Sequence, residues 1–162
     1  MAESLKNEVL LRIVSKQYTE SLEPTEVAFE RVLTLEDEVE ILTEATTYMK
    51  GGTLYIIYEE PEDTGFSGAR TMIKYRDDQV QLRRYSADDL IDTNFILQEG
   101  VQNISRYKLP MGMFDMLIYT NRLEADIQSP CEGSIFIDYN IQFGDVESRR
   151  NKLDMEFKKY DN

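Results

Sequence analysis

The side chains in this chain that could do chemistry are carboxylates, arginines, tyrosines and one cysteine, because the sequence contains no histidine. Histidine is the most common general base and neutral metal ligand, so its absence disfavours catalytic triads and metal chemistry. A zinc site would have to combine Cys131 with carboxylates, and no cationic neighbour activates that thiol. We therefore expect no catalytic residue, no metal and no cofactor, and an enzyme is the least favoured alternative.

Adjacent carboxylates occur at three places, Glu59-Glu60, Asp77-Asp78 and Asp88-Asp89. A glycosidase dyad needs two carboxylates that face each other across a cleft. Neighbouring residues on a strand point to opposite faces, so none of these pairs forms a dyad by itself. We expect all three pairs in turns or on solvent faces, and Asp77-Asp78 suits a hairpin turn.

Arg84 is the charged residue with the most informative position. It follows Val80 and Leu82 at alternate positions, so on a strand it shares their apolar face. A charge on that face must be paired or hydrogen-bonded, because isolated burial is very costly. Two roles stay open: a structural plug at one end of a barrel, bonded to backbone carbonyls, or an anchor for a ligand carboxylate, which the guanidinium fork matches.

Tyrosine is abundant, with ten residues, and tryptophan is absent. Four tyrosines fall on apolar-phased positions: Tyr58, Tyr75, Tyr107 and Tyr139. A tyrosine buries a large ring and keeps a polar tip that needs a partner. These side chains are interpreted either as core packing or as the wall of a partly polar pocket. In the second case Met113, with Met111 and Met116, would supply an adaptable wall near one mouth.

Strands must position these residues, because apolar side chains recur at every second position over much of residues 39–160, as at Leu54, Ile56 and Tyr58. Turn signals at Gly51-Gly52 and Asp77-Asp78 separate such runs and predict hairpins. We expect eight to ten strands in one all-β domain over residues 1–162. The favoured architecture is a closed or nearly closed antiparallel up-and-down barrel, with a sandwich as the alternative.

Residues 20–37 do not fit this rhythm clearly. Val27, Phe29 and Leu33 suit a strand, whereas the spacing of Ala28 and Val32 suits a short helix. We interpret the segment as an insertion, or as a cap over one mouth of the barrel.

The chain carries a formal net charge of −13, which disfavours nucleic acid and anionic membranes as partners. Residues 1–65 hold fifteen acidic and five basic side chains, whereas residues 66–162 hold sixteen and thirteen. This acidic first third is either a solubilising surface or a docking face for a basic protein. A single cysteine suits a reducing compartment, and no leader or spanning segment is evident, so we expect a cytoplasmic protein.

An ordered set of short motifs resembles the YwiB-like family of small bacterial proteins. The motifs are Thr71-Met72-Ile73-Lys74, Val80-Gln81-Leu82-Arg83-Arg84, Phe95, Gly100, Tyr107-Lys108-Leu109-Pro110-Met111-Gly112, Thr120, Gly133 and Tyr139. The resemblance covers most of the chain from about residue 39. The chain departs from the family pattern at Tyr85-Ser86 after Arg84, between Phe95 and Gly100, and in its longer segment Glu20 to Asp37.

The resemblance implies a calycin-like β-barrel, similar in shape to lipocalins and fatty-acid-binding proteins, which mostly carry small apolar ligands. The family has no established activity, so it supplies no catalytic residues to transfer. Two main hypotheses for function follow. The first is a non-enzymatic barrel that binds a small amphipathic ligand at Arg84, the four tyrosines and Met113. The second is a protein-interaction module that uses the acidic N-terminal surface and has a packed interior.

Overall fold

The fold is a closed antiparallel β-barrel, described here from a computed structural model over residues 5–61, 68–144 and 148–160. Those residues contain ten strands and no helix. The strands are β1 (Asn7–Pro24), β2 (Phe29–Lys50), β3 (Thr53–Glu59), β4 (Ala69–Arg76), β5 (Gln79–Ser86), β6 (Asp92–Gln98), β7 (Gln102–Leu109), β8 (Gly112–Ser129), β9 (Glu132–Phe143) and β10 (Arg149–Lys159).

Every strand lies beside its neighbours in sequence, and β1 closes the barrel by pairing with both β2 and β10. The predicted up-and-down barrel is therefore confirmed, with the upper number of expected strands. Tight turns join β2 to β3 and β4 to β5: Gly51 and Gly52 have φ of 60° and 81°, and Asp77 and Asp78 have φ of 48° and 59°. Positive φ at both turn positions matches the twist of the flanking strands.

The hydrophobic core lies inside the barrel, and among the described residues its buried side chains come from every strand except β7. Fully buried members include Leu11 of β1, Ile56 of β3, Ile73 of β4 and Ile137 of β9. They come from the alternate positions that the sequence marks as apolar, so each strand gives one face to the core and one to solvent.

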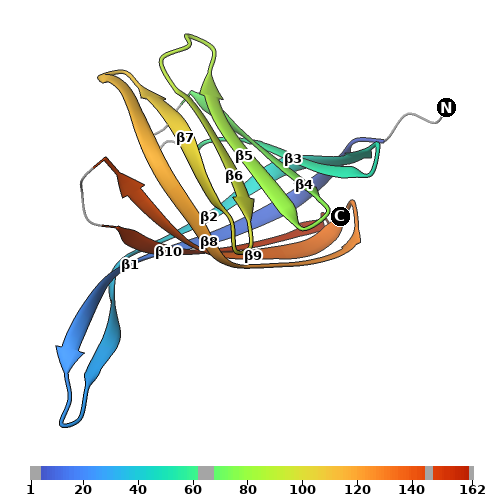
Figure 1. The fold of residues 1–162 in the computed structure, drawn as a ribbon. Coiled ribbons are helices and arrows are strands. Elements are labelled where there is room, and N and C mark those ends of the chain that lie inside the picture. Colours follow the sequence, from blue (N-terminus) through green and yellow to red (C-terminus); the bar gives the residue numbers. More distant parts are fainter. Residues whose placement is uncertain (1–4, 62–67, 145–147, 161–162) are drawn as a thin grey trace.

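Residues 20–37 form the outer part of a long β1–β2 hairpin rather than a helix. Figure 1 shows this arm, in blue at the lower left, projecting away from the barrel rather than lying over its mouth. The register of the hairpin shifts at its base: Gln17 pairs with Asp37 and Tyr18 with Leu35, so Glu36 is an extra residue in β2. Such a bulge bends a strand and increases its twist, which explains why the arm leaves the barrel wall there.

Two pairs of neighbouring strands in the barrel wall are joined by few paired residues in the described part of the chain. β2 pairs with β3 only from Thr46 to Lys50, and β6 pairs with β7 only at Asp92–Lys108 and Thr93–Tyr107. The ladder has no further pairs between β6 and β7 among the described residues, and Gly100, in the connection between the two strands, has φ of 77°.

Candidate functional site in the barrel interior

A row of inward-facing side chains crosses five neighbouring strands at one level of the barrel. The register pairs each member with the next: Tyr58 (β3), Thr71 (β4), Arg84 (β5), Thr93 (β6) and Tyr107 (β7). Directly opposed residues on neighbouring strands point to the same face. This polar row is therefore continuous along the inner wall, although every member is far from the others in sequence.

Four of the remaining strands, β8, β9, β10 and β1, contribute a second polar row. Thr120 of β8 pairs with Tyr139 of β9, Tyr139 with Asn151 of β10, and Asn151 with Gln17 of β1. Gln17, Tyr139 and Asn151 line the same interior cavity as Arg84 and Tyr107. The two rows together give the interior polar groups on both halves of its wall.

Arg84 forms an ion pair inside the barrel with Glu60, the residue directly after β3. The Arg84 Nε lies 3.1 Å from Glu60 Oε1, and it also lies 3.4 Å from the hydroxyl of Thr71. Thr71 donates its own hydrogen bond to the same carboxylate oxygen. The Glu60 side chain is 0% exposed and that of Arg84 is 20% exposed. The pair therefore joins β3, β4 and β5 within the wall while Arg84 still reaches the cavity.

The tyrosine hydroxyls on this wall are held in the neutral form. Burial raises the pKa of Tyr58, and the nearby charge of Glu60 raises it further. Burial also raises the pKa of Tyr107, and it raises the pKa of Tyr139 to about 12. The positive charge of Arg84 opposes the shift at all three residues, so one guanidinium acts electrostatically on the whole set.

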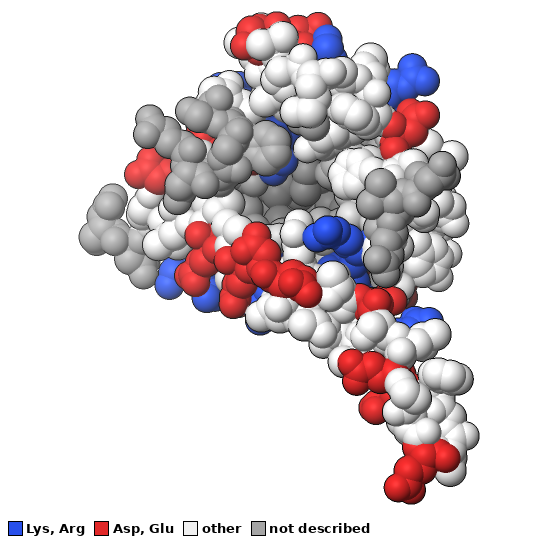
Figure 2. All heavy atoms as spheres, turned by 90° about the vertical axis from the view of Figure 1, so that its left-hand side faces the viewer, with Lys and Arg blue, Asp and Glu red and all other residues white. Residues whose placement is uncertain are grey.

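The cavity enclosed by this wall has a volume of about 380 Å³. An apolar row lies next to the polar row: Ile56, Ile73, Leu82 and Phe95 pair in turn across β3 to β6. The last three of these line the cavity, together with Met116 of β8. Figure 2 shows a hollow in one face of the molecule, with atoms of Lys and Arg in blue at its edge. The interior is thus amphipathic, with an apolar part and polar groups at one level.

The charges that line the cavity differ in sign from the charge of the whole chain. Among the described residues, Arg84 and Arg149 are the basic lining residues and Glu60 is the acidic one, a net charge of +1 for that part of the lining in a chain of net charge −13. Three buried oxygens, Glu60 Oε2, Thr93 Oγ1 and Thr120 Oγ1, have no hydrogen-bond partner among the described residues. Of these three residues, only Glu60 lines the cavity, so one of these oxygens belongs to its lining.

The structure brings four of the six predicted ligand-binding residues to the cavity, namely Tyr58, Arg84, Tyr107 and Tyr139. Tyr75 is not among the lining residues; its hydroxyl donates a hydrogen bond to Asp78 Oδ1 at 3.1 Å beside the β4–β5 turn. Met113 is 57% exposed and borders a shallow groove on the outside of the barrel. Of the three methionines considered together, Met116 is the one that lines the cavity.

Glu60 is the residue that sequence reasoning missed. It was expected in a turn or on a solvent face, but its carboxylate is buried against Arg84, so that expectation is wrong. A signal was available: Tyr58 points inward, and a strand that continued two residues would point Glu60 inward as well. The exposed neighbour Glu59, which pairs with Arg70 at 2.7 Å, follows the expectation.

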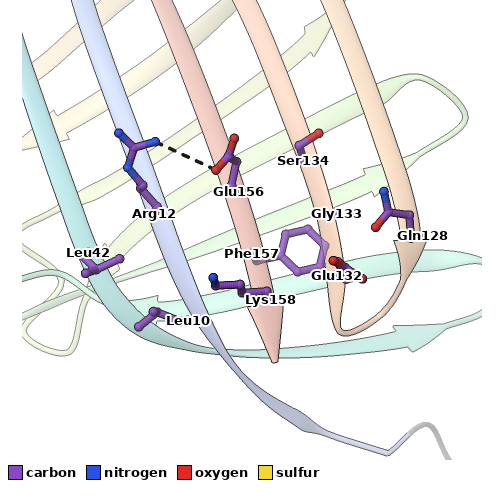
Figure 3. Close-up of a pocket in the computed structure, with 10 residues that line it drawn as sticks. All are labelled: Leu10, Arg12, Leu42, Gln128, Glu132, Gly133, Ser134, Glu156, Phe157 and Lys158. Atoms are coloured by element: carbon purple, nitrogen blue, oxygen red, sulfur yellow. Dashed lines mark ion pairs between the residues drawn. The ribbon is translucent and has the colours of Figure 1, made fainter. Parts of the chain in front are cut away.

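A second depression, of about 440 Å³, lies on the outer face of the barrel (Figure 3). It crosses β2, β1, β10, β9 and β8, and its rim includes the ion pair of Arg12 with Glu156 at 4.0 Å. Leu42 lines it and is 62% exposed. Its charged side chains are exposed and loosely paired, whereas the interior cavity has buried polar groups that converge. The interior is therefore the better candidate for a binding site.

The described part of the chain holds neither a cluster of metal-ligating side chains nor a membrane-spanning helix. No group of three or more Cys, Asp or Glu side chains there is arranged to hold a metal ion. The same residues form no helix of the length and apolar character needed to span a membrane.

Fold and site together define this protein as a closed ten-stranded antiparallel barrel with an amphipathic interior cavity. The family model described as Domain of unknown function (DUF1934) matches residues 31–155, and the chain belongs to that family. The resemblance to YwiB-like proteins is confirmed by the crystal structure of the ywiB protein from Bacillus subtilis. That structure has a TM-score of 0.73 and 18% sequence identity, over 96% of this chain and 94% of the other. No curated protein matches the chain.

Proposed function

We propose that this protein is a non-enzymatic, calycin-like binding barrel that holds one small amphipathic anion in its interior cavity. The observation that carries the proposal is the polar row at Arg84 beside an apolar wall, around a cavity of about 380 Å³. That volume lies within the range of small-molecule sites, which are mostly apolar with a few converging polar groups. The single cysteine supports a cytoplasmic location for this function.

The charge of the cavity selects the class of ligand. Arg84 and Arg149 offer two cations to an entering group, and Glu60 neutralises one of them. A ligand carboxylate or sulfonate restores neutrality, and the hydroxyls of Tyr107 and Tyr139 are protonated donors at neutral pH. The apolar part of the ligand contacts the wall formed by Ile73, Leu82 and Met116.

Native mass spectrometry of the protein purified from cells is the first test. A bound mass that leaves on unfolding supports the proposal. The same protein is then titrated with anilinonaphthalene sulfonate, an amphipathic anion whose fluorescence rises in apolar surroundings. We expect saturable binding of one probe per chain. A bare chain that also takes up no probe would contradict the proposal and would favour a filled, purely structural interior.

Two neighbouring residues of β2 provide a matched control for the location of binding. Ile41 lines the cavity, whereas Leu42 points outward. Ile41→Trp places an indole in the cavity and should reduce probe affinity at least about tenfold, because a filled site excludes the ligand. Leu42→Trp should leave affinity unchanged. Equal loss in both variants, or loss only in Leu42→Trp, would move the site to the outer groove.

A further inference from the structure

The longest open sheet edge in the described part of the chain belongs to β2. One side of this strand pairs with β1 from Phe29 to Thr47. The other side pairs with β3 only at Thr46 to Lys50, so residues 29–45 have no strand partner there among the described residues. At alternate residues of such an edge, the backbone N–H and C=O groups point outward and can pair with another strand.

Other open edges among the described residues are shorter: β8 has no strand partner beyond Thr120 on the side of β7, and β1 has none beyond Tyr18 on the side away from β2. β1 pairs with β10 from Val9 to Tyr18 on the side away from β2. The seam between β6 and β7 is crossed by a bridge of Glu99 with Thr120 and by a hydrogen bond from Asn103 Nδ2 to the Ile96 carbonyl at 2.9 Å. The open edge of β2 therefore differs from the others in the described part of the chain by its length.

The side chains along the open edge are acidic and partly apolar. Residues 29–45 hold six acidic side chains and one basic side chain, a net charge of −5. Two of the acids form ion pairs with β1: Glu40 lies 3.0 Å from Arg12, and Glu38 lies 3.9 Å from Lys16. These pairs are solvent-exposed, and such pairs contribute little energy. Phe29 and Leu42 are 72% and 62% exposed, so the edge also offers apolar contacts.

This charge pattern determines which kind of strand can pair with the open edge of β2. Edge pairing between two copies of the chain would set acidic side chains opposite acidic ones, which is destabilising. Charged residues on an edge commonly prevent self-association in this way. An incoming strand with lysine or arginine at alternate positions would instead meet opposite charge and would complete the ladder.

We propose that the open edge of β2, residues 29–45, docks an extended basic segment of another protein by strand addition. Main-chain hydrogen bonds supply much of the affinity in this binding mode, and the side chains supply the specificity. The inference does not depend on the interior ligand, because it uses the backbone edge and exposed side chains of one strand.

The test uses the full chain and a short fluorescent peptide of alternating lysine and valine. We expect saturable binding in fluorescence anisotropy, with amide hydrogen exchange slowed within residues 29–45. The same peptide with alternate backbone nitrogens methylated keeps its charge but cannot complete a ladder. It should bind at least about tenfold more weakly. A peptide of alternating glutamate and valine should not bind.

Matched variants test whether the peptide binds the open edge of β2 or is attracted by acidic charge anywhere on the surface. Glu30→Gln with Asp37→Asn removes two charges from the edge, and Glu124→Gln with Asp115→Asn removes two from the outer face of β8. The first variant should weaken peptide binding about threefold to tenfold, and the second should leave it unchanged. Absence of binding, equal binding of the methylated peptide, equal effects of the two variants, or protection outside residues 29–45 would each overturn the proposal.

Discussion

At the residue scale, the Glu60–Arg84 pair is the most consequential contact in the barrel. The carboxylate is removed from solvent, and its partners are the Arg84 guanidinium and the Thr71 hydroxyl. A buried ion pair need not be stabilising relative to apolar residues, but loss of one partner leaves an uncompensated buried charge. The pair therefore links the end of β3 to β5 across the intervening strand β4.

Arg84→Met should reduce the free energy of unfolding by about 3 kcal/mol, because Glu60 then remains buried without its cation. The matched control is Arg83→Met on the outer face, where the pair with Asp92 is exposed and the expected loss is below about 1 kcal/mol. Urea unfolding measures both. Addition of Glu60→Gln to Arg84→Met should restore part of the loss. Equal effects at Arg83 and Arg84 would show that the inner pair has no special role.

Tyr139 makes stability depend on pH in the alkaline range. Its pKa is 10.0 in an exposed tyrosine and about 12 in the folded protein. Between these values the unfolded chain loses the proton while the folded chain keeps it, so stability falls as pH rises. Tyr139→Phe should flatten this decline when urea midpoints are compared at pH 9 and pH 11. An unchanged slope would show that Tyr139 titrates normally in the barrel.

At the element scale, β9 and β10 depend on a close approach at Gly133. This residue pairs with Phe157, whose ring is packed in the core. A Cβ at Gly133 would lie 2.9 Å from Phe157 Cζ, 2.9 Å from the Asp126 carbonyl oxygen and 3.1 Å from Ile127 Cδ1. Glycine is needed here for space, because its φ is not in the left-handed region. The absent side chain lets the aromatic ring cover the backbone of β9.

Gly133→Ala should destabilise the barrel by about 1–3 kcal/mol, because the added methyl group overpacks a backbone oxygen and a buried ring. Ser134→Ala, one residue along and on the other face of β9, is the control and should have a small effect. Thermal unfolding followed by circular dichroism measures both. The double variant Gly133→Ala with Phe157→Leu should lose less stability than the sum of the losses in the two single variants. Strict additivity would argue against a direct clash with the ring.

At the scale of the whole molecule, the charge is distributed unevenly. The chain has a net charge of −13, and Figure 2 shows acidic atoms in red around the rim of the hollow and along the projecting arm. The described residues that line the cavity, in contrast, have a net positive charge. Anionic ligands thus meet general repulsion from the surface and local attraction from the interior, and a basic protein partner meets attraction at the arm.

Added sodium chloride should raise the free energy of unfolding at neutral pH by on the order of 1 kcal/mol, because salt screens the repulsion within a highly acidic chain. The exposed ion pairs, such as Arg12–Glu40, are weak and should offset little of this gain. Urea midpoints at low and high salt measure the effect. A midpoint that falls with salt would show that surface ion pairs outweigh the net repulsion.

Local patterns predicted much of the fold. Alternation placed Arg84 with Val80 and Leu82 on the inner face, and the turn chemistry of Gly51-Gly52 and Asp77-Asp78 located two hairpins. The partner of Arg84 could not be predicted in this way. Glu60 lies 24 residues away, and their contact depends on the register of β3, β4 and β5 together.

The amino-acid sequence by itself determined the strands, their turns, the all-β class and the inward position of Arg84, because alternation and turn preference act between near neighbours. Tertiary structure alone decided that residues 20–37 extend an arm, that Met116 rather than Met113 reaches the cavity, and that two polar rows meet around it. The physical reason is that closing the barrel fixes the register between distant strands, and register determines which inward side chains share one level.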